Sequence, residues 1–154
     1  MTTPLEKLRQ YGYELPQPKA PVASYVPVRR VGNLLYISGQ ISIDANEVVM
    51  EGLLGDTMNV VQGGNAAELC AVNVLAQIVH TANVRLEDVV QMVKLTIFVA
   101  SAPDFHEQHL VANGGSNLII GVLGDKGRHA RSAIGVPSLP RGAAVEIEAI
   151  VEVA

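Results

Sequence analysis

The sequence contains no tryptophan, and aromatic residues make up only 4% of its 154 residues. Because hydrophobic residues nevertheless account for 49% of the chain, the core must be built mainly from valine, isoleucine, leucine and alanine. So few aromatic side chains also argue against a surface that stacks the bases of single-stranded nucleic acid.

Basic residues are scarce as well. Lysine and arginine number 11 against 15 aspartates and glutamates, which gives a formal net charge of −4. Nucleic-acid binding depends on clustered lysines and arginines that displace counterions. The only basic groupings are the pair Arg29 and Arg30 and the spaced set Lys126, Arg128 and Arg131. We therefore predict no nucleic-acid partner.

Cys70 is the single cysteine, so no intrachain disulfide can form. It lies among apolar residues without a basic neighbour, which predicts a packed thiol rather than a nucleophile. The four histidines are not spaced as metal ligands, so we predict no metal site. No apolar run approaches the roughly 20 residues of a membrane span. Residues 4–10 resemble a short amphipathic helix rather than a signal peptide, and we predict a cytoplasmic protein with no membrane partner.

Length and hydrophobic periodicity predict one domain of the α+β class. Helices are expected over residues 65–82 and from residue 103 to about residue 123. Strands are expected over residues 25–30, 34–38, 48–51, 92–100, 131–136 and 145–153. We expect them to form two β-β-α-β halves, with the helices on one face of a mixed sheet.

The C-terminal segment alternates strictly between apolar and charged residues. Val145, Ile147 and Ala149 are interleaved with Glu146 and Glu148, a period of two that predicts a strand with one charged face. Such a face is typical of a solvated edge strand, but it also fits a functional site.

Arg131 gives the charged face a second interpretation. It lies on the preceding apolar segment, and Pro140 and Gly142 mark the turn, so we expect Arg131 and Glu146 on neighbouring strands. Arginine presents a planar fork of donors that matches a carboxylate. The pair therefore either binds a small metabolite's carboxylate while a glutamate handles water or a proton, or forms an ion pair that ties two strands together.

Three groups of motifs carry a family resemblance. They are Gly32-Asn33-Leu34-Leu35-Tyr36-Ile37-Ser38-Gly39-Gln40-Ile41, then Val93-Lys94-Leu95-Thr96-Ile97-Phe98-Val99, and finally Ala130-Arg131-Ser132, Gly135-Val136, Leu139-Pro140 and Val145-Glu146-Ile147-Glu148-Ala149. In this order they resemble the Rid superfamily, also called the YjgF or endoribonuclease L-PSP family. The resemblance covers about residues 21–153, so it implies one domain over residues 21–154, preceded by an N-terminal extension over residues 1–20.

The resemblance implies a chorismate-mutase-like fold, in which two helices pack on one face of a mixed sheet and three chains form a homotrimer. It implies hydrolysis of reactive enamines or imines to 2-oxo acids and ammonia in a cleft between subunits, without a cofactor. Arg131 matches the arginine that binds the substrate carboxylate, and Glu146 matches the glutamate that activates water. Tyr25, Ser38 and Asn113 match residues that line the same cleft.

The chain also departs from the pattern of the imine deaminases. Ala23 and Ser24 stand where Gly-Pro usually precedes the tyrosine, and Ala133 stands at a substrate-binding position where the family usually has cysteine. These departures predict a sister branch of the family. Because Arg131 and Glu146 are retained, we expect its partner to be a small carboxylate-bearing metabolite. Two alternatives remain: a regulatory trimer that binds carboxylates without catalysis, and an endoribonuclease, which the negative net charge disfavours.

Overall fold

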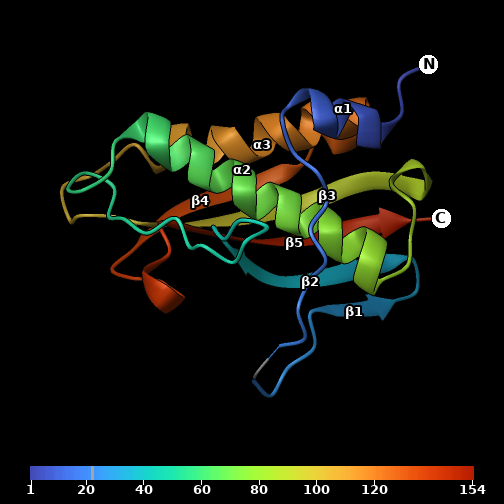
Figure 1. Ribbon diagram of the computed structural model, residues 1–154, viewed down its shortest axis with the longest axis horizontal. Helices are drawn as coiled ribbons and strands as arrows, with labels where there is room; N and C mark the ends of the chain where they lie inside the picture. The colour runs from blue at the N-terminus through green and yellow to red at the C-terminus, as the bar shows by residue number, and fades with distance from the viewer. Residues whose placement is uncertain (22) are drawn as a thin grey trace.

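A five-stranded sheet with helices on one face forms the centre of the computed structural model, which describes residues 1–21 and 23–154 (Figure 1). The strands are β1 (Val28–Val31), β2 (Leu34–Ile41), β3 (Val89–Ala100), β4 (Ala130–Val136) and β5 (Val145–Val153). The α-helices are α1 (Pro4–Gln10), α2 (Val60–Ala76) and α3 (Gln108–Leu123). A π-helical turn, η1 (Gln77–Thr81), extends α2, and three short 3₁₀ turns complete the elements: η2 (Leu86–Asp88), η3 (Gly124–Gly127) and η4 (Pro140–Gly142). The α+β class predicted from the sequence is confirmed.

The strand order corrects one prediction. The sheet runs β1-β2-β5-β3-β4, and every pairing is antiparallel except the parallel pair of β3 and β4. Arg131 on β4 and Glu146 on β5 are therefore not on neighbouring strands, because β3 lies between them. The chain order β-β-α-β-α-β-β also replaces the two β-β-α-β halves that the sequence suggested.

Both long helices begin elsewhere than predicted. The helix α2 starts at Val60, five residues early, because Asn59 and Gln62 form a capping box: each side chain accepts a hydrogen bond from the other residue's backbone N–H. Gly63 and Gly64 thus lie inside the helix rather than before it. The helix α3 starts at Gln108, five residues later than predicted.

Two predicted strands differ as well. The first strand begins only at Val28, so Tyr25 lies in the irregular segment before it. The segment over residues 48–51 forms isolated bridges, Ile43 with Val49 and Glu51 with Ala143, instead of a strand of its own.

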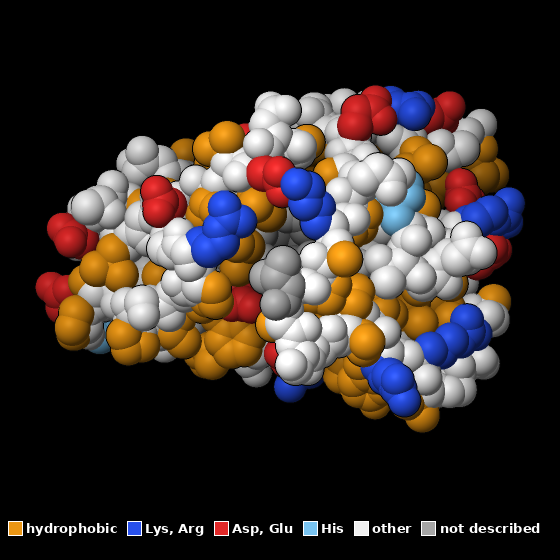
Figure 2. All heavy atoms as spheres, turned by 60° about the horizontal axis from the view of Figure 1, so that its bottom comes forward, with side chains coloured by type: hydrophobic (Ala, Val, Ile, Leu, Met, Phe, Trp, Pro, Cys, Tyr) orange, Lys and Arg blue, Asp and Glu red, His pale blue; other side chains and the backbone are white. Residues whose placement is uncertain are grey.

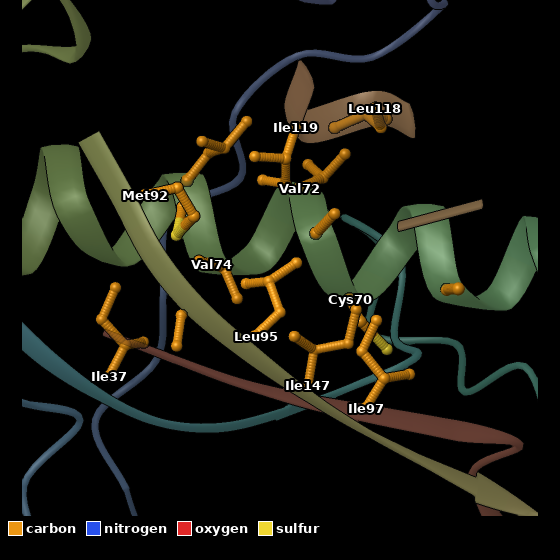
Figure 3. Packing of buried hydrophobic residues seen from close by; sticks show 14 of the residues in the cluster. Ile37, Cys70, Val72, Val74, Met92, Leu95, Ile97, Leu118, Ile119 and Ile147 are labelled. Carbon is orange, nitrogen blue, oxygen red and sulfur yellow. The ribbon is translucent and has the colours of Figure 1, made fainter. Parts of the chain in front are cut away.

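The core lies between the sheet and the helices. Leu95, Ile97 and Ile147 point from β3 and β5 toward Cys70 of α2, and all four are fully buried (Figure 3). The prediction of a packed thiol at Cys70 is confirmed. The N-terminal residues join this core, because α1 packs on α3 and its Leu8 is only 1% exposed.

Within the described part of the chain, no helix covers the other face of the sheet (Figure 1). Large hydrophobic side chains remain exposed there, including Tyr36 at 44% and Ile134 at 45%. Seen from the side of β1 and β2, hydrophobic side chains form patches between scattered basic ones (Figure 2). Along the described ranges 1–21 and 23–154, no helix is both long and apolar enough to span a bilayer.

Glycines bring α2 and α3 into close approach. A Cβ at Gly114 of α3 would collide with the backbone of Gly64 on α2, whereas a Cβ at Gly64 would meet no atom within 4 Å. The backbones of the two helices therefore touch at Gly114, and this contact places α3 above β3 and β4.

This contact generates a prediction with a matched control. Gly114→Ala should lower the free energy of unfolding by about 1–3 kcal/mol, because the added methyl group forces two backbones apart. Gly64→Ala should be neutral or raise it by up to about 1 kcal/mol, because alanine favours helix and the added methyl group has free space. Urea unfolding of both variants measures the difference. Equal effects of the two substitutions would contradict the close approach.

Candidate functional site

Arg131 and Glu146 lie on opposite faces of the sheet. Arg131 pairs in register with Leu95, whose side chain points into the core beneath the helices. Glu146 directly precedes the buried Ile147 on β5. Because successive side chains of a strand point to opposite faces, Glu146 faces the side without helices.

The two residues are also far apart along the sheet. Leu95 pairs with Arg131 on one side and Ala149 on the other, so Glu146 lies two strands across and three residues along from Arg131. With strand spacings of about 4.8 Å and a rise of about 3.3 Å per residue, their Cα atoms are about 14 Å apart. None of the salt bridges among the described residues involves either side chain. The interpretation of Arg131 and Glu146 as an ion pair within one chain is therefore wrong.

Arg131 is held by neutral groups of α3. Its Nη1 donates to Oδ1 of Asn113 at 2.9 Å and to Oγ of Ser116 at 3.2 Å. Its Nη2 donates to the backbone carbonyl of His109 at 3.3 Å. Asn113 and Ser116 are three residues apart, so they lie on the same face of the helix, above β4.

These bonds leave part of the guanidinium unused. Arginine carries five N–H donors, and three of them are engaged by α3. The Nε–H and one Nη2–H have no hydrogen-bond partner within the described part of the chain, and no carboxylate neutralises the charge. Ala133 follows two residues later on the same face and packs against the core.

His129 completes this arrangement. Its Nε2 lies 2.9 Å from Oγ of Ser116, and its Nδ1 lies 2.6 Å from the carbonyl oxygen of Gly127. Burial lowers the pKa of His129 below its usual value, and the nearby charge of Arg131 lowers it further, while the hydrogen bond to Gly127 opposes both. We refer to Arg131, Asn113, Ser116, His129 and Ala133 as the arginine group.

Glu146 is the centre of a second group. Its carboxylate lies against Gly39 of β2 so closely that a Cβ on Gly39 would collide with Oε1. The contact occurs where the register of β2 against β5 shifts between Ile37 and Gln40. Burial raises the pKa of Glu146, and the neighbouring charge of Glu148 raises it further.

Ser38 directly precedes Gly39 on β2. Its hydroxyl donates to the Val26 carbonyl at 2.8 Å and so ties the segment that carries Tyr25 to β2. Tyr25 is 54% exposed and lines, together with Gly39, a cavity of about 430 Å³ that also reaches Asn73 of α2 and does not include Glu146 in its lining. We refer to Glu146, Gly39, Ser38 and Tyr25 as the glutamate group.

The structure therefore separates the predicted site residues into two sets. Arg131, Asn113 and Ala133 fall in the arginine group, whereas Glu146, Ser38 and Tyr25 fall in the glutamate group. Sequence reasoning missed Ser116, which contacts Arg131 because α3 docks above β4, and His129, which contacts Ser116. One available signal was the polar pair Asn113 and Ser116 on a helix that is otherwise largely apolar.

The side chains give less support to a cysteine nucleophile or a metal site. Burial raises the pKa of the Cys70 thiol well above its usual value, so the thiolate that a nucleophile needs is disfavoured. In residues 1–21 and 23–154, no three histidine, cysteine, aspartate or glutamate side chains gather as metal ligands.

Known proteins resemble this chain along most of its length. Protein TCP17 of Trypanosoma cruzi is 44% identical over 146 residues, which is 94% of this chain and 91% of that protein. A 2-iminobutanoate/2-iminopropanoate deaminase of Dermatophagoides farinae is 32% identical, with coverage of 85% of this chain and 87% of that protein. A crystal structure of a protein of unknown function from Agrobacterium tumefaciens has a TM-score of 0.92 and 48% identity, and covers 99% of this chain and 94% of that one.

The family itself is recognised over residues 16–153, which match the family described as Endoribonuclease L-PSP. That span includes both the arginine group and the glutamate group. The resemblance drawn from the sequence motifs is confirmed: this chain belongs to the endoribonuclease L-PSP family, also known as the YjgF or Rid family.

Proposed function

We propose that this protein is a hydrolase that converts small 2-imino or 2-enamino acids to 2-oxo acids and ammonia. The proposed site joins the arginine group of one chain to the glutamate group of a second chain in a homotrimer. The observation that carries the proposal is Arg131, which is oriented by three neutral acceptors and keeps two donors free. The relative from Dermatophagoides farinae, named as a 2-iminobutanoate/2-iminopropanoate deaminase, supports the reaction class.

Arg131 binds the carboxylate of the substrate in this proposal. The carboxylate accepts from the unused Nε–H and Nη2–H, a two-pronged contact that fixes both position and orientation. Since Asn113 and Ser116 already hold the guanidinium, little side-chain freedom is lost when the ligand binds. Holding the substrate in one orientation removes part of the entropic barrier to reaction.

Glu146 acts on water. Its raised pKa makes the carboxylate a better proton acceptor than an ordinary glutamate. Gly39 has no side chain, so the carboxylate can lie directly against the backbone of β2.

The reaction then balances without another reagent. Water adds its oxygen to the imine carbon while Glu146 takes one of its protons and passes that proton to the imine nitrogen. The tetrahedral intermediate carries a hydroxyl and an amino group on one carbon. Glu146 then takes the proton of the hydroxyl, which becomes the carbonyl of a 2-oxo acid, and gives that proton to the amino group as the C–N bond breaks and ammonia leaves.

A second chain is needed because one chain holds the two groups on opposite faces. The open face of the sheet offers an apolar surface for such an assembly, with Val31 exposed at 62%, Tyr36 at 44% and Ile134 at 45%. Exposed apolar side chains of this kind are commonly covered by another subunit. Three-fold symmetry follows from the family resemblance and is part of the proposal.

A coupled assay tests the proposal. A threonine dehydratase generates 2-iminobutanoate, and semicarbazide traps whatever imine this protein has not hydrolysed. We expect the protein to reduce the trapped fraction in proportion to its concentration. Tight carboxylate binding without any such reduction would instead identify the regulatory binder, and RNA cleavage that persists through purification and disappears in Arg131→Ala would favour an endoribonuclease.

Two substitutions should separate binding from catalysis. Arg131→Lys keeps the charge but loses the two-pronged geometry, so carboxylate affinity should fall by about 1.5–3 kcal/mol. Glu146→Gln keeps the size but cannot accept a proton, so kcat should fall about 100-fold or more while binding is largely kept. Calorimetry with 2-oxobutanoate and the coupled assay measure the two effects. If both variants lower only the melting temperature, the site assignment is wrong.

Mixing two inactive variants tests whether the site is shared. Arg131→Ala supplies an intact glutamate group and Glu146→Gln an intact arginine group, so chains refolded together in equal amounts should regain about one quarter of wild-type activity, the chance that a given interface joins two intact groups. Each variant refolded alone is the control. Activity that stays at the level of the separate variants would place the whole site within one chain.

Gly39→Ala tests Glu146 without touching it. The new methyl group collides with the end of a flexible side chain, so the carboxylate should move while folding stability changes little. We expect kcat to fall by about tenfold or more, because a displaced base no longer reaches the water. The double variant Gly39→Ala with Glu146→Gln should be no worse than Glu146→Gln alone. Additive losses would show that Gly39 acts by another route.

A further inference from the structure

His129, Ser116 and Arg131 form a continuous chain of hydrogen bonds. From the carbonyl oxygen of Gly127, the contacts run to Nδ1 of His129 at 2.6 Å, from its Nε2 to Oγ of Ser116 at 2.9 Å, and on to Nη1 of Arg131 at 3.2 Å. Ser116 is only 6% exposed and His129 is partly buried, so water has little access to replace these bonds.

The groups at the two ends of this series of hydrogen bonds, Gly127 and Arg131, fix the direction of every bond in it. The Gly127 carbonyl can only accept, so Nδ1 of His129 carries the proton, and a neutral ring then leaves Nε2 as an acceptor. The Ser116 hydroxyl must therefore donate to Nε2. Arg131 can only donate, and a lone pair on the same hydroxyl oxygen accepts its Nη1–H. Every group is satisfied in this one arrangement.

We propose that His129 is a positioning residue that holds Arg131 in its binding orientation through Ser116, and that protonation of His129 releases Arg131 and weakens carboxylate binding. A protonated ring would present N–H at Nε2, so the Ser116 hydroxyl would have to turn its own hydrogen away. Its oxygen would then accept from two cations, His129 and Arg131. The identity of the ligand rests on the proposed function, whereas the positioning of Arg131 does not.

The surrounding charges favour the neutral ring. The strand β4 contributes Arg131, and the turn η3 and its C-cap contribute Asp125, Lys126 and Arg128, of which Asp125 and Arg128 pair with each other at 3.4 Å. Lys94 of β3 pairs in register with Ala130, next to His129. The helix α3 contains no carboxylate between residues 108 and 123, and its only titratable side chain is His109. Burial and the Arg131 charge lower the pKa of His129, so the ring is neutral near pH 7.

The first experiment measures 2-oxobutanoate affinity by calorimetry between pH 5 and pH 8. Wild-type affinity should decline as the pH falls and His129 takes up a proton, toward a limit about tenfold weaker than at pH 8, the scale of one hydrogen bond to a charged group. His129→Gln keeps a neutral acceptor and cannot titrate, so it should retain the affinity measured at pH 8 and lose this decline. His129→Phe has no acceptor and should bind weakly throughout. His106→Gln, which changes an exposed histidine in the loop before α3, should behave as wild type.

Two results would overturn the proposal. One is an acidic decline in His129→Gln as steep as in wild type, which would assign the effect to another group, such as Glu146. The other is wild-type affinity in His129→Phe. Should His129→Phe fail to fold by circular dichroism, Ser116→Ala, which also interrupts the chain of hydrogen bonds, takes its place with the same expectation.

A second measurement separates this inference from the proposed function. In protein without ligand, the ¹⁵N signals of the Arg131 side chain report how freely the guanidinium rotates. We expect slow rotation in wild type and His129→Gln at pH 7.5, and faster rotation in His129→Phe and in wild type at pH 5. If no carboxylate binds but these signals change as expected, the proposed function fails and the positioning role stands. Identical signals in all samples would exclude the positioning role.

Discussion

The alternation of side chains along each strand, combined with helices on only one face, governs the chemistry available to this fold. Leu95 and Ile147 must point toward the helices to form the core. This fixes the face of the sheet on which the side chains in register with them lie. Arg131 follows Leu95 onto the helix side, and Glu146, next to Ile147, is forced onto the open side. A one-residue shift in either strand would exchange these positions and also expose the core. The placement of Arg131 and Glu146 is therefore as firmly fixed as the core itself.

The contact between the two long helices determines how well Arg131 is held. Because Gly114 has no side chain, α3 lies close against Gly64 of α2, and in this position α3 presents Asn113 and Ser116 to β4. All three acceptors around Arg131 are neutral. A carboxylate among them would neutralise the guanidinium and compete with an anionic ligand, whereas neutral oxygens orient it and leave its charge available.

The sequence predicted local features, such as single strands, better than it predicted which strands pair and which side chains meet. Strict alternation around Ile147 correctly predicted β5 and its charged face, and Asn113, which was expected in the same cleft as Arg131, accepts a hydrogen bond from it. The pairing of β4 with β3 instead of β5 could not be read from the residues around Arg131, because a parallel neighbour reached through a helix leaves no turn signal between the strands. The predicted helix begins after Gly63 and Gly64, whereas both lie inside α2, and Gly64 meets Gly114 of α3 in a contact that only the tertiary structure reveals. Ser116 and His129 depend on the same docking and were missed for the same reason.

Neither Arg131 nor Glu146 has an oppositely charged partner among the described residues. Arg131 is a guanidinium whose partners within the described residues are all neutral, and Glu146 is a half-buried carboxylate beside another glutamate, which raises its pKa. Each arrangement is electrostatically unfavourable in an isolated chain. In the proposed assembly, a second chain brings opposite charges to one cleft and lessens both costs. Three hydrogen bonds to α3 hold Arg131 in place, so in this assembly it does not move to form an ion pair with Glu146. A ligand carboxylate can then occupy the free donors of Arg131 while Glu146 remains available to act on water.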